Sequence, residues 1–307
     1  MSKQTRPRLS KSEIIKRREK TVSFIILFIV SIIWVFPLIY MLGVAFRVDN
    51  DFQLNPARLF PTWGNWTLEN FSGYVVRDGE MDNFIYWIIN SLWSTAASVI
   101  LTLIMDLVCA FAVVFIRFKG QNVFMKFLFI WYAVPGVIGT AASFSIYAGL
   151  IKALNIAENE GALYPFIYAW MIVPGTTGIF NFLLMRNFFT SIPQDIIDSA
   201  KSDGASNLHI FFKIILPLSK STIMLIVLFT FVGAWNSLQG PQLLLSVSSN
   251  RHFETLTVAL AGYTGGSTSK FGIQMSSAAF ALIPSILVFI FTQNKMIDGL
   301  ATTGIKR

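Results

Sequence analysis

Six long apolar runs constrain this chain more than any other feature of its sequence. One of them, Asn83 to Ile116, contains a single charged residue, Asp106. The other five contain none: Thr21 to Phe46, Phe127 to Ile151, Gly161 to Met185, Ser221 to Asn250 and Phe271 to Asn294. A helix needs about 20 apolar residues to cross the roughly 30 Å hydrocarbon core of a bilayer. Buried helices of a soluble protein would rarely be this long six times over, so we predict an all-α membrane protein with six transmembrane helices.

The basic residues predict the orientation, because cytoplasmic segments of membrane proteins are enriched in Lys and Arg. The segment before the first run carries eight of them, and placing it inside gives the inner segments 18 of the 24 basic residues. Six spans then leave both termini in the cytoplasm. We divide the chain into a basic tail, residues 1–20, and a six-span domain, residues 21–307, with an inner loop at about 186–220.

The remaining composition excludes several functions. The net charge of +8 is explained by a tail that faces anionic lipid headgroups, so we expect no nucleic-acid partner. The single Cys109 excludes an internal disulfide and a cysteine-based metal cluster. His209 and His252 fall on opposite sides of the membrane, which leaves no metal site. No catalytic motif is present, and we expect no enzyme activity.

Prolines inside the apolar runs predict kinked helices, since each removes a backbone donor. In two runs the proline is followed by glycine, at Pro135-Gly136 and Pro174-Gly175. Pro165 lies in the same run as Pro174, and Pro37 and Pro284 interrupt two other runs. Neighbouring helices can absorb such kinks in a static bundle, so the prolines alone do not indicate a transporter.

The inner loop contains a polar stretch, DSAKSDGASNLHIFFKIILP, from Asp198 to Pro217. Ser191 and Gln194 have the spacing of a capping box, with Pro193 at an early helical position, and a short helix should run to about Ser202. Asp203-Gly204 indicates a turn. A second series with helical spacing follows, at Leu208, Phe211, Phe212, Ile215 and Leu216.

Small residues at this turn suit close docking of another protein. Ser199, Ala200, Gly204 and Ala205 leave little side chain between the backbone and a partner. An interfacial helix that rests on lipid is the alternative, and composition alone favours it.

The stretch resembles the EAA loop of binding-protein-dependent ABC import permeases, whose pattern is E-A-A-x-x-x-G, nine residues, then I-x-L-P. Asp198, Ser199 and Ala200 occupy the E-A-A positions, and Gly204 and Pro217 match the later ones. WTLENF from Trp66, NSL from Asn90, Trp235-Asn236 and the tail QNKMIDGLATTGIKR are similar to the MalG-like permease of maltose-type sugar importers. The resemblance runs from about Phe60 to the C-terminus.

Two positions depart from the pattern. The motif's Glu is Asp198 and its first Ala is Ser199. If the family's acid pairs with a basic residue of the ATPase, Asp198 should do so with altered geometry. The tail ends in Lys306-Arg307 where the family often has Lys-Gly.

The resemblance implies the type I ABC importer permease fold and a coupling role for the inner loop. In the family a dimeric ATPase grips this loop, and its closure switches the helices between inward-open and outward-open states. The sequence has no G-x-x-x-x-G-K-[ST] loop, so ATP and Mg would bind to the partner ATPase. The residues expected to couple are Asp198, Ser199, Ala200, Asp203, Gly204, Ala205, Leu208, Phe211 and Pro217.

Polar residues in or beside the spans are candidates for a solute pathway. They are Asp106, Asn90, Trp235, Asn236 and Gln239. Asp106 is the only charge inside a span, and such residues are by default functional candidates. A structural position in the inner half of its helix explains Asp106 equally simply, and the others can be ordinary residues at helix ends.

We therefore expect a permease subunit of a sugar or oligosaccharide importer in the bacterial cytoplasmic membrane. Its expected partners are a second homologous permease, an ATPase dimer and an extracytoplasmic binding protein, which should contact the last outer loop around Arg251 to Leu256. The alternative is an ion- or proton-coupled transporter that uses Asp106 and works without other chains.

Overall fold

The computed structural model describes residues 11–72, 81–116, 118–134, 136–262 and 271–304. These residues form helices and turns, and within them the backbone has no β-strand beyond one isolated bridge between Arg47 and Trp66. The basic residues of 1–10, Pro135 and the end of the tail, 305–307, lie outside the described residues. The prediction of an all-helical chain is confirmed.

The chain divides into two compact units, each described by itself. The first contains α1 (Lys11–Ala45), α2 (Asp49–Leu54), α3 (Glu69–Ser72) and the first turns of α15 (Phe271–Gly304). Almost every side chain of α1 from Val22 to Leu42 is exposed, and all of these except Ser23, Ser31 and Tyr40 are apolar. A helix that is apolar on all sides and unpacked is typical of a membrane span.

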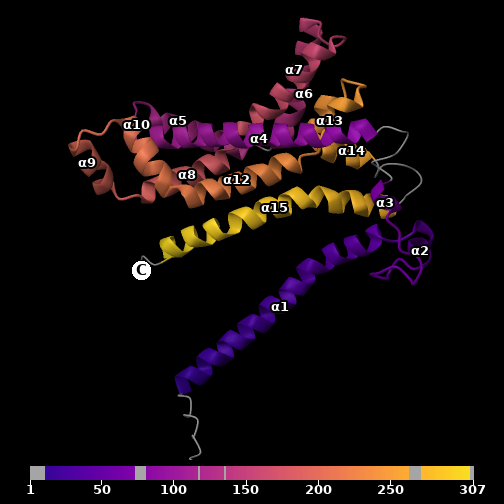
Figure 1. Cartoon of the computed structure of the whole chain (residues 1–307). Coiled ribbons are helices and arrows are strands. Elements are labelled where there is room, and N and C mark those ends of the chain that lie inside the picture. The colour runs from indigo at the N-terminus through magenta and orange to yellow at the C-terminus, as the bar shows by residue number, and fades with distance from the viewer. Residues whose placement is uncertain (1–10, 73–80, 117, 135, 263–270, 305–307) are drawn as a thin grey trace, which may run out of the picture. The chain divides into compact units, whose positions relative to one another are not determined.

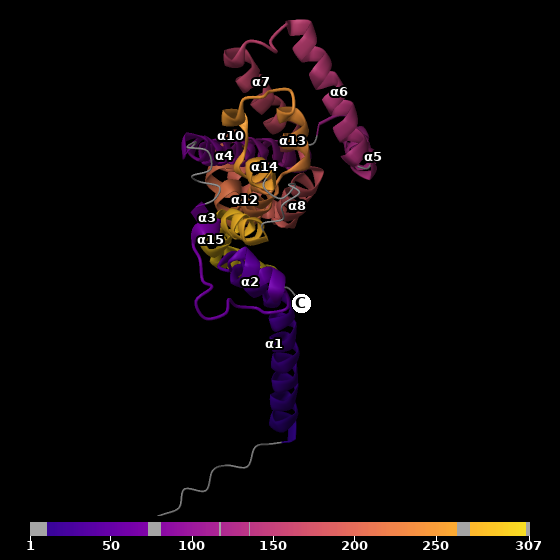
Figure 2. The same ribbon diagram turned by 90° about the vertical axis from the view of Figure 1, so that its right-hand side faces the viewer.

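The second unit is a helix bundle around α4 (Met81–Phe111), which continues as a π-helical stretch, Ala112–Ile116. α8 (Ile179–Ser191) and α12 (Lys220–Trp235) pack against α4, as Figure 1 and the end-on view of Figure 2 show. The remainder of α15 belongs to this unit. Its further helices are α5 (Gln121–Ala133), α6 (Gly136–Leu154), α7 (Glu160–Ile172), α9 (Gln194–Ser202), α10 (Asn207–Ile210), α11 (Leu216–Leu218), α13 (Gln239–Leu245) and α14 (Leu256–Gly262).

Three helices are single pieces long and apolar enough to cross a membrane: Arg17–Ala45, Asn83–Ile116 and Phe271–Asn294. Three bent pairs qualify if each pair is one span: α5 with α6, α7 with α8, and Asn207–Leu218 with α12. The described chain therefore has room for up to six crossings. Six crossings and cytoplasmic termini stay predictions.

The predicted break at Pro174 is confirmed, while α5 and α6 are bent by 95° at the break that contains Pro135, which lies outside the described residues. A 3₁₀ turn at Pro174–Thr177 separates α7 from α8, because Pro174 starts a new turn. Pro37, Pro165 and Pro284 lie inside continuous helices. The uncharged run from Ser221 to Asn250 is not one helix, since α12 ends at Trp235 and α13 starts at Gln239.

Candidate functional site

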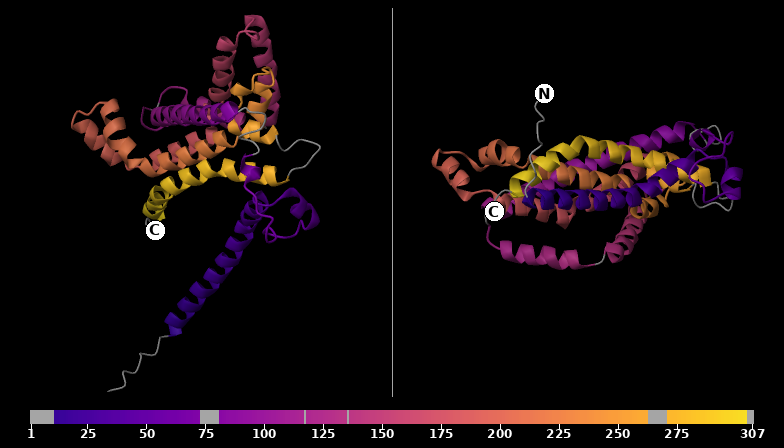
Figure 3. Two further views of the ribbon diagram at one scale, coloured as in Figure 1. Left: turned by 45° about the vertical axis from the view of Figure 1, so that its right-hand side comes forward. Right: turned by 90° about the horizontal axis from the view of Figure 1, so that it is seen from below.

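The inner loop folds into two short helices that meet at a sharp corner, at the end of the bundle where α8 ends and α12 begins (Figure 3). We call residues 194–218 the elbow segment. The first helix, α9, ends at Ser202 as predicted. The predicted capping box is wrong, because Ser191 still belongs to α8 and its hydroxyl donates to the Phe188 carbonyl oxygen over 2.7 Å. The Gln194 side chain instead donates to Asp198 Oδ1 over 3.1 Å.

A Schellman motif closes α9 at the corner. The Gly204 amide donates to the Lys201 carbonyl oxygen and the Ala205 amide to the Ala200 carbonyl oxygen, both over 3.0 Å. This geometry requires a left-handed residue, and Gly204 has φ +81°. Glycine adopts that conformation without steric cost. The corner is therefore a fixed backbone structure set by one residue.

The second helix of the elbow segment begins at Ser206, whose side chain accepts from the His209 amide over 3.3 Å. It continues from α10 through a π-helical stretch, Phe211–Ile215, into α11. Pro217 is the second residue of α11, and a missing proline donor is a common cause of such irregular turns. The helix then meets α12 at an angle of 75°.

One face of the elbow segment is anchored in the bundle. Ile197, Ile210, Phe211 and Ile215 are buried in a cluster with side chains of α4 and α8. The Phe211 ring lies 5.1 Å from the ring of Phe111, measured between centroids. Movement of the elbow segment must therefore shift α4 and α8 as well, since packed interiors transmit displacement.

The other face is exposed and partly apolar. Leu208 is 70% exposed and Phe212 57% exposed. A Cβ added at Gly204 would meet no atom within 4 Å. The carboxylate of Asp198 forms no ion pair within the described residues. Among the predicted coupling residues, Asp198, Ser199, Asp203, Gly204, Leu208 and Pro217 are exposed, Ala200 and Ala205 are half-buried, and Phe211 is buried.

Two elbow residues have roles that sequence reasoning did not assign. Ile210 anchors the segment, although it was left out of the apolar series that we read from the sequence. Phe212 is in that series, but it is 57% exposed, and its ring contacts that of Phe211 at 5.0 Å. The N-cap at Ser206 is the signal that would have set the helical register correctly, because it fixes where the second helix begins.

A second candidate site is a cavity of about 260 Å³ inside the bundle, lined by apolar residues together with uncharged polar ones. One wall is the face of α4 that carries Ser91, Ser94, Thr95 and Ser98, which repeat at helical spacing. The remaining lining residues are Met171, Ile172, Gly175, Asn181, Thr230, Gly233, Ala234, Trp235, Ser237, Pro241 and Thr255. None of the lining residues is charged.

The cavity has hydrogen-bonding capacity to spare. Asn181 Nδ2 donates to Thr230 Oγ1 over 3.0 Å, which leaves the Thr230 hydroxyl hydrogen free to donate. Thr255 is only 7% exposed, and its Oγ1 has no hydrogen-bond partner. Buried hydroxyl groups are normally paired, so these groups suit a neutral, hydroxyl-bearing ligand or water.

The predicted pathway residues do not gather at one place. Trp235 lines the cavity, with its indole nitrogen donating to the Ala281 carbonyl oxygen over 2.9 Å. Asn236 and Gln239 are exposed. Asp106 is 3% exposed, and its Oδ2 has no partner. Asp106 and Thr102, which is buried and also unpartnered, continue the polar face of α4 beyond the cavity.

Asn90 contacts residues 251–254, which we call the outer segment after their predicted side of the membrane, and it does not line the cavity. Its Nδ2 donates to the carbonyl oxygens of His252 and Glu254 over 2.7 and 3.1 Å, while its Oδ1 accepts from the Tyr164 hydroxyl over 2.7 Å. Trp87 Nε1 donates to the Arg251 carbonyl oxygen over 2.8 Å. These bonds fix the backbone of residues 251–254 on α4.

The fixed outer segment presents polar side chains outward. Arg251 and His252 are exposed, and the His252 ring stacks on Tyr86 at 4.5 Å. Burial raises the pKa of Glu254, although the nearby Arg251 opposes the shift. The segment ends at Thr255, which lines the cavity.

Comparison with known proteins gives a family match over most of the bundle. Residues 107–296 match the model described as binding-protein-dependent transport system inner membrane component. The diacetylchitobiose uptake system permease protein DasC of Streptomyces coelicolor is 28% identical over 89% of this chain and 92% of its own. The arabinooligosaccharides transport system permease protein AraQ of Halalkalibacterium halodurans is 26% identical over 90% and 93%.

Two further matches extend the range of solutes. The sn-glycerol-3-phosphate transport system permease protein UgpE of Salmonella typhi is 27% identical over 86% of this chain and 90% of its own. The crystal structure of a bacterial ABC transporter involved in the import of the acidic polysaccharide alginate matches with a TM-score of 0.68. It covers 94% of this chain and 99% of the solved chain at 21% identity, a likeness that concerns the fold.

Proposed function

Because this chain belongs to the family of inner membrane components of binding-protein-dependent transport systems, we propose that it is a permease subunit of a carbohydrate ABC importer. The elbow segment couples its helices to ATP hydrolysis on a separate ATPase. The observation that carries this proposal is the two-faced elbow segment, buried through Ile210 and exposed through Leu208. ATP and Mg bind to the ATPase, and this chain contributes no catalytic group.

The exposed corner is suited to binding in a groove of the ATPase. Leu208 and Phe212 project from a helix that starts three residues after the corner, and such apolar anchors commonly carry the energy of an interface. Ala200, Ala205 and Gly204 leave room for a partner's backbone to approach. Asp198, whose side chain is one methylene shorter than that of the usual Glu, then pairs with a basic residue of the ATPase.

A neutral sugar or oligosaccharide is the proposed solute. Two relatives are named for oligosaccharide transport, and the cavity offers hydroxyl groups, an amide and an indole. An anionic solute such as the glycerol phosphate of a third relative requires a cation or several amide donors. The absence of any charged lining residue therefore favours the neutral class.

The remaining partners follow from the family. They are a second, homologous permease and a solute-binding protein outside the membrane, with the importer in the bacterial cytoplasmic membrane. The binding protein docks on the exposed side chains of the outer segment, Arg251 and His252. Because the backbone of this segment is held by Trp87 and Asn90, docking there acts on α4 directly.

Co-purification of the ATPase after mild solubilisation tests the coupling proposal. Gly204→Trp fills the corner with a ring and should release the ATPase, whereas Gly178→Trp, at the other end of α8, should retain it. Vesicles that contain this chain alone should not accumulate solute. Uptake by the chain alone, or full ATPase retention by Gly204→Trp, would contradict the proposal.

A further inference from the structure

The loop that follows α1 is built as a rigid support for a single exposed tryptophan. Trp63 is fully exposed and lies in a turn that the Asn65 amide closes by donating to the Thr62 carbonyl oxygen over 2.9 Å. Gly64, the third residue of the turn, has φ +90°, as a type II turn requires. Within the described residues Trp63 forms no ring contact and no hydrogen bond.

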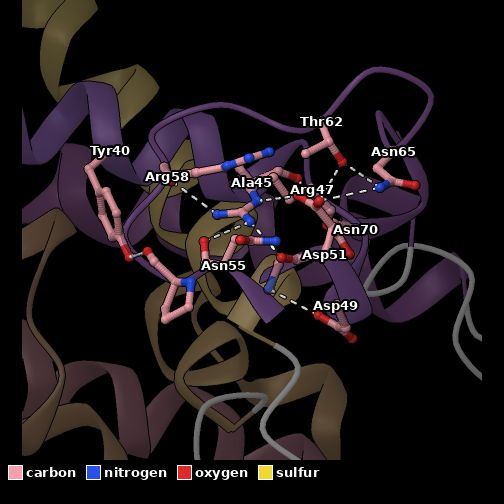
Figure 4. Close-up of polar contacts among 12 residues, drawn as sticks. Tyr40, Ala45, Arg47, Asp49, Asp51, Asn55, Arg58, Thr62, Asn65 and Asn70 are labelled. Carbon is pink, nitrogen blue, oxygen red and sulfur yellow. Dashed lines mark hydrogen bonds and ion pairs between the residues drawn. The ribbon is translucent and has the colours of Figure 1, made fainter. Parts of the chain in front are cut away.

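The turn is fixed from below by a buried ion pair (Figure 4). Arg47 Nε lies 2.7 Å from Asp51 Oδ2, and both residues are buried. Thr62 and Asn65, the two ends of the turn, donate to Asp51 Oδ1. Arg47 also donates to the carbonyl oxygens of Asp51, Asn55 and Arg58. No buried side-chain nitrogen or oxygen atom of Arg47, Asp51, Thr62 or Asn65 lacks a hydrogen-bond partner, so the turn has a defined place on the end of α1.

The loop folds back beside the span. The Tyr40 hydroxyl, five residues before the end of α1, donates to the Pro56 carbonyl oxygen over 2.8 Å. The Val48 amide donates to the Asn65 carbonyl oxygen over 3.3 Å. Thus Pro56 is bound to the last turns of α1, through Tyr40, and Asn65 is bound to Val48, three residues after α1 ends.

The uncharged run of α1 is longer than the hydrocarbon core requires. Thr21 to Phe46 measures about 39 Å as a helix, against a core of roughly 30 Å. The end of α1 therefore lies at headgroup depth, and the loop tied to it lies there too. Around the turn, apolar side chains are exposed at Leu54, Phe60, Trp66 and Leu68. The segment Pro61–Trp66 carries no charge.

We infer that the Thr62–Asn65 turn inserts Trp63 into the headgroup region of the leaflet at the outer end of α1. Tryptophan favours this depth because its ring is apolar and its N–H still finds a partner. A ring held out on a rigid turn loses little conformational freedom on insertion. The turn thereby sets the depth and rotation of α1 in the bilayer.

Electron paramagnetic resonance on the assembled importer tests the inference. Trp63→Cys in a Cys109→Ser background carries a nitroxide, in nanodiscs of phosphatidylethanolamine and phosphatidylglycerol. Trp34→Cys, at a 77% exposed position in the middle of α1, calibrates the acyl-chain signal, and Gln53→Cys, exposed on α2, supplies a loop reference. We expect collision rates with oxygen and with a nickel chelate that place position 63 at headgroup depth, with or without the binding protein.

Two results would overturn the inference. A nickel accessibility at position 63 equal to that of a free nitroxide in water would mean that the turn does not touch lipid. Immobilisation at position 63 only after the binding protein is added would assign the turn to that protein. Since Trp63 contacts nothing else in the described chain, the cysteine variant should assemble normally.

Discussion

The amide of Ala205 donates to the carbonyl oxygen of Ala200 over 3.0 Å. This bond reverses the chain at the exposed corner between α9 and α10. The bond exists only while Gly204 stays left-handed. A Cβ atom at position 204 meets no atom within 4 Å, so the cost of an alanine in the isolated chain is conformational and not steric.

Gly204→Ala should therefore weaken the corner without disturbing the bundle. A left-handed L-residue costs about 1–2 kcal/mol, which corresponds to roughly fivefold to thirtyfold faster hydrogen exchange at the Ala205 amide. Gly204→Asn should exchange more slowly than Gly204→Ala, because asparagine tolerates this conformation better. Hydrogen exchange followed by mass spectrometry measures the order, and equal rates in all three proteins would contradict the Schellman assignment.

The exposed and buried apolar residues of the elbow segment should fail in different ways. Leu208→Ser should weaken ATPase retention about tenfold or more, since burial of a leucine contributes about 1.5–3 kcal/mol. Its thermal midpoint should stay near that of the wild type. Phe211→Ser should lower the thermal midpoint itself, because it opens a cavity in a buried cluster.

Leu218→Ser is the matched control for this pair, as Leu218 is an exposed leucine at the far end of the same segment. Titration of solubilised permease with ATPase, together with a thermal shift assay, separates the effects. A Leu208→Ser variant that unfolds, or one that keeps full ATPase affinity, would remove Leu208 from the docking surface.

Loss of single hydroxyl groups from the cavity should raise the KM of uptake. Thr95→Val and Thr255→Val each remove one hydrogen bond to solute, worth about 0.5–1.5 kcal/mol, so KM should rise roughly twofold to tenfold while ATPase retention is unchanged. Thr292→Val is the control, because that hydroxyl donates to the Val288 carbonyl oxygen of its own helix. An unchanged KM in both cavity variants would exclude this cavity from the solute pathway.

The loop that carries Trp63 should loosen in acid. The Thr62 hydroxyl and Arg47 hold the pKa of Asp51 at about 2, below its ordinary 3.8, against the effect of burial. A lowered pKa stabilises the folded loop fully above the ordinary value, and this contribution is lost as the pH falls from about 4 towards 2. Limited proteolysis of residues 47–72 should accelerate over that range.

Asp51→Asn should remove this pH dependence and start from a loosened loop, because Arg47 is then buried without a counter-charge. A loop in Asp51→Asn that is still as resistant as wild type at pH 7 would show that the ion pair does not fix the turn. The comparison needs only the purified importer in nanodiscs.

The sequence predicted those backbone features that depend only on neighbouring residues, such as turns and helix breaks. Asp203-Gly204 predicted the corner, and Pro174 predicted the break between α7 and α8, because each residue restricts its own backbone. Ser191 predicted a side-chain cap for α9 that does not form, since α8 continues through Ser191 and the residue at the N-cap of α9 is Pro193. Ser206 caps the next helix instead, and only the hydrogen bonds of the folded chain distinguish the two serines.

Long-range contacts set the remainder of the site. Asn90 looked like a pathway residue, but its partners are the carbonyl oxygens of His252 and Glu254, more than 160 positions away. The hydroxyl groups on one face of α4 form a site only because they lie opposite Thr230 and Thr255 in the folded chain. Such pairings depend on how the helices pack, which periodicity does not encode.

Asp106 separates the importer from the ion-coupled alternative. Its carboxylate is buried without a partner for Oδ2, one turn beyond the equally unpartnered Thr102. A buried polar group without a partner is costly in a membrane, so Asp106→Asn, which cannot ionise, should leave the thermal midpoint equal or higher. If ATP drives transport, uptake by the assembled importer should stay within about twofold of wild type, since no proton or ion has to bind there.

The ion-coupled alternative instead predicts loss of uptake in Asp106→Asn and uptake by this chain alone under a proton or sodium gradient. Uptake measured in proteoliposomes with ATP and with each gradient in turn distinguishes the two, because only one of them needs both the ATPase and an intact corner at Gly204.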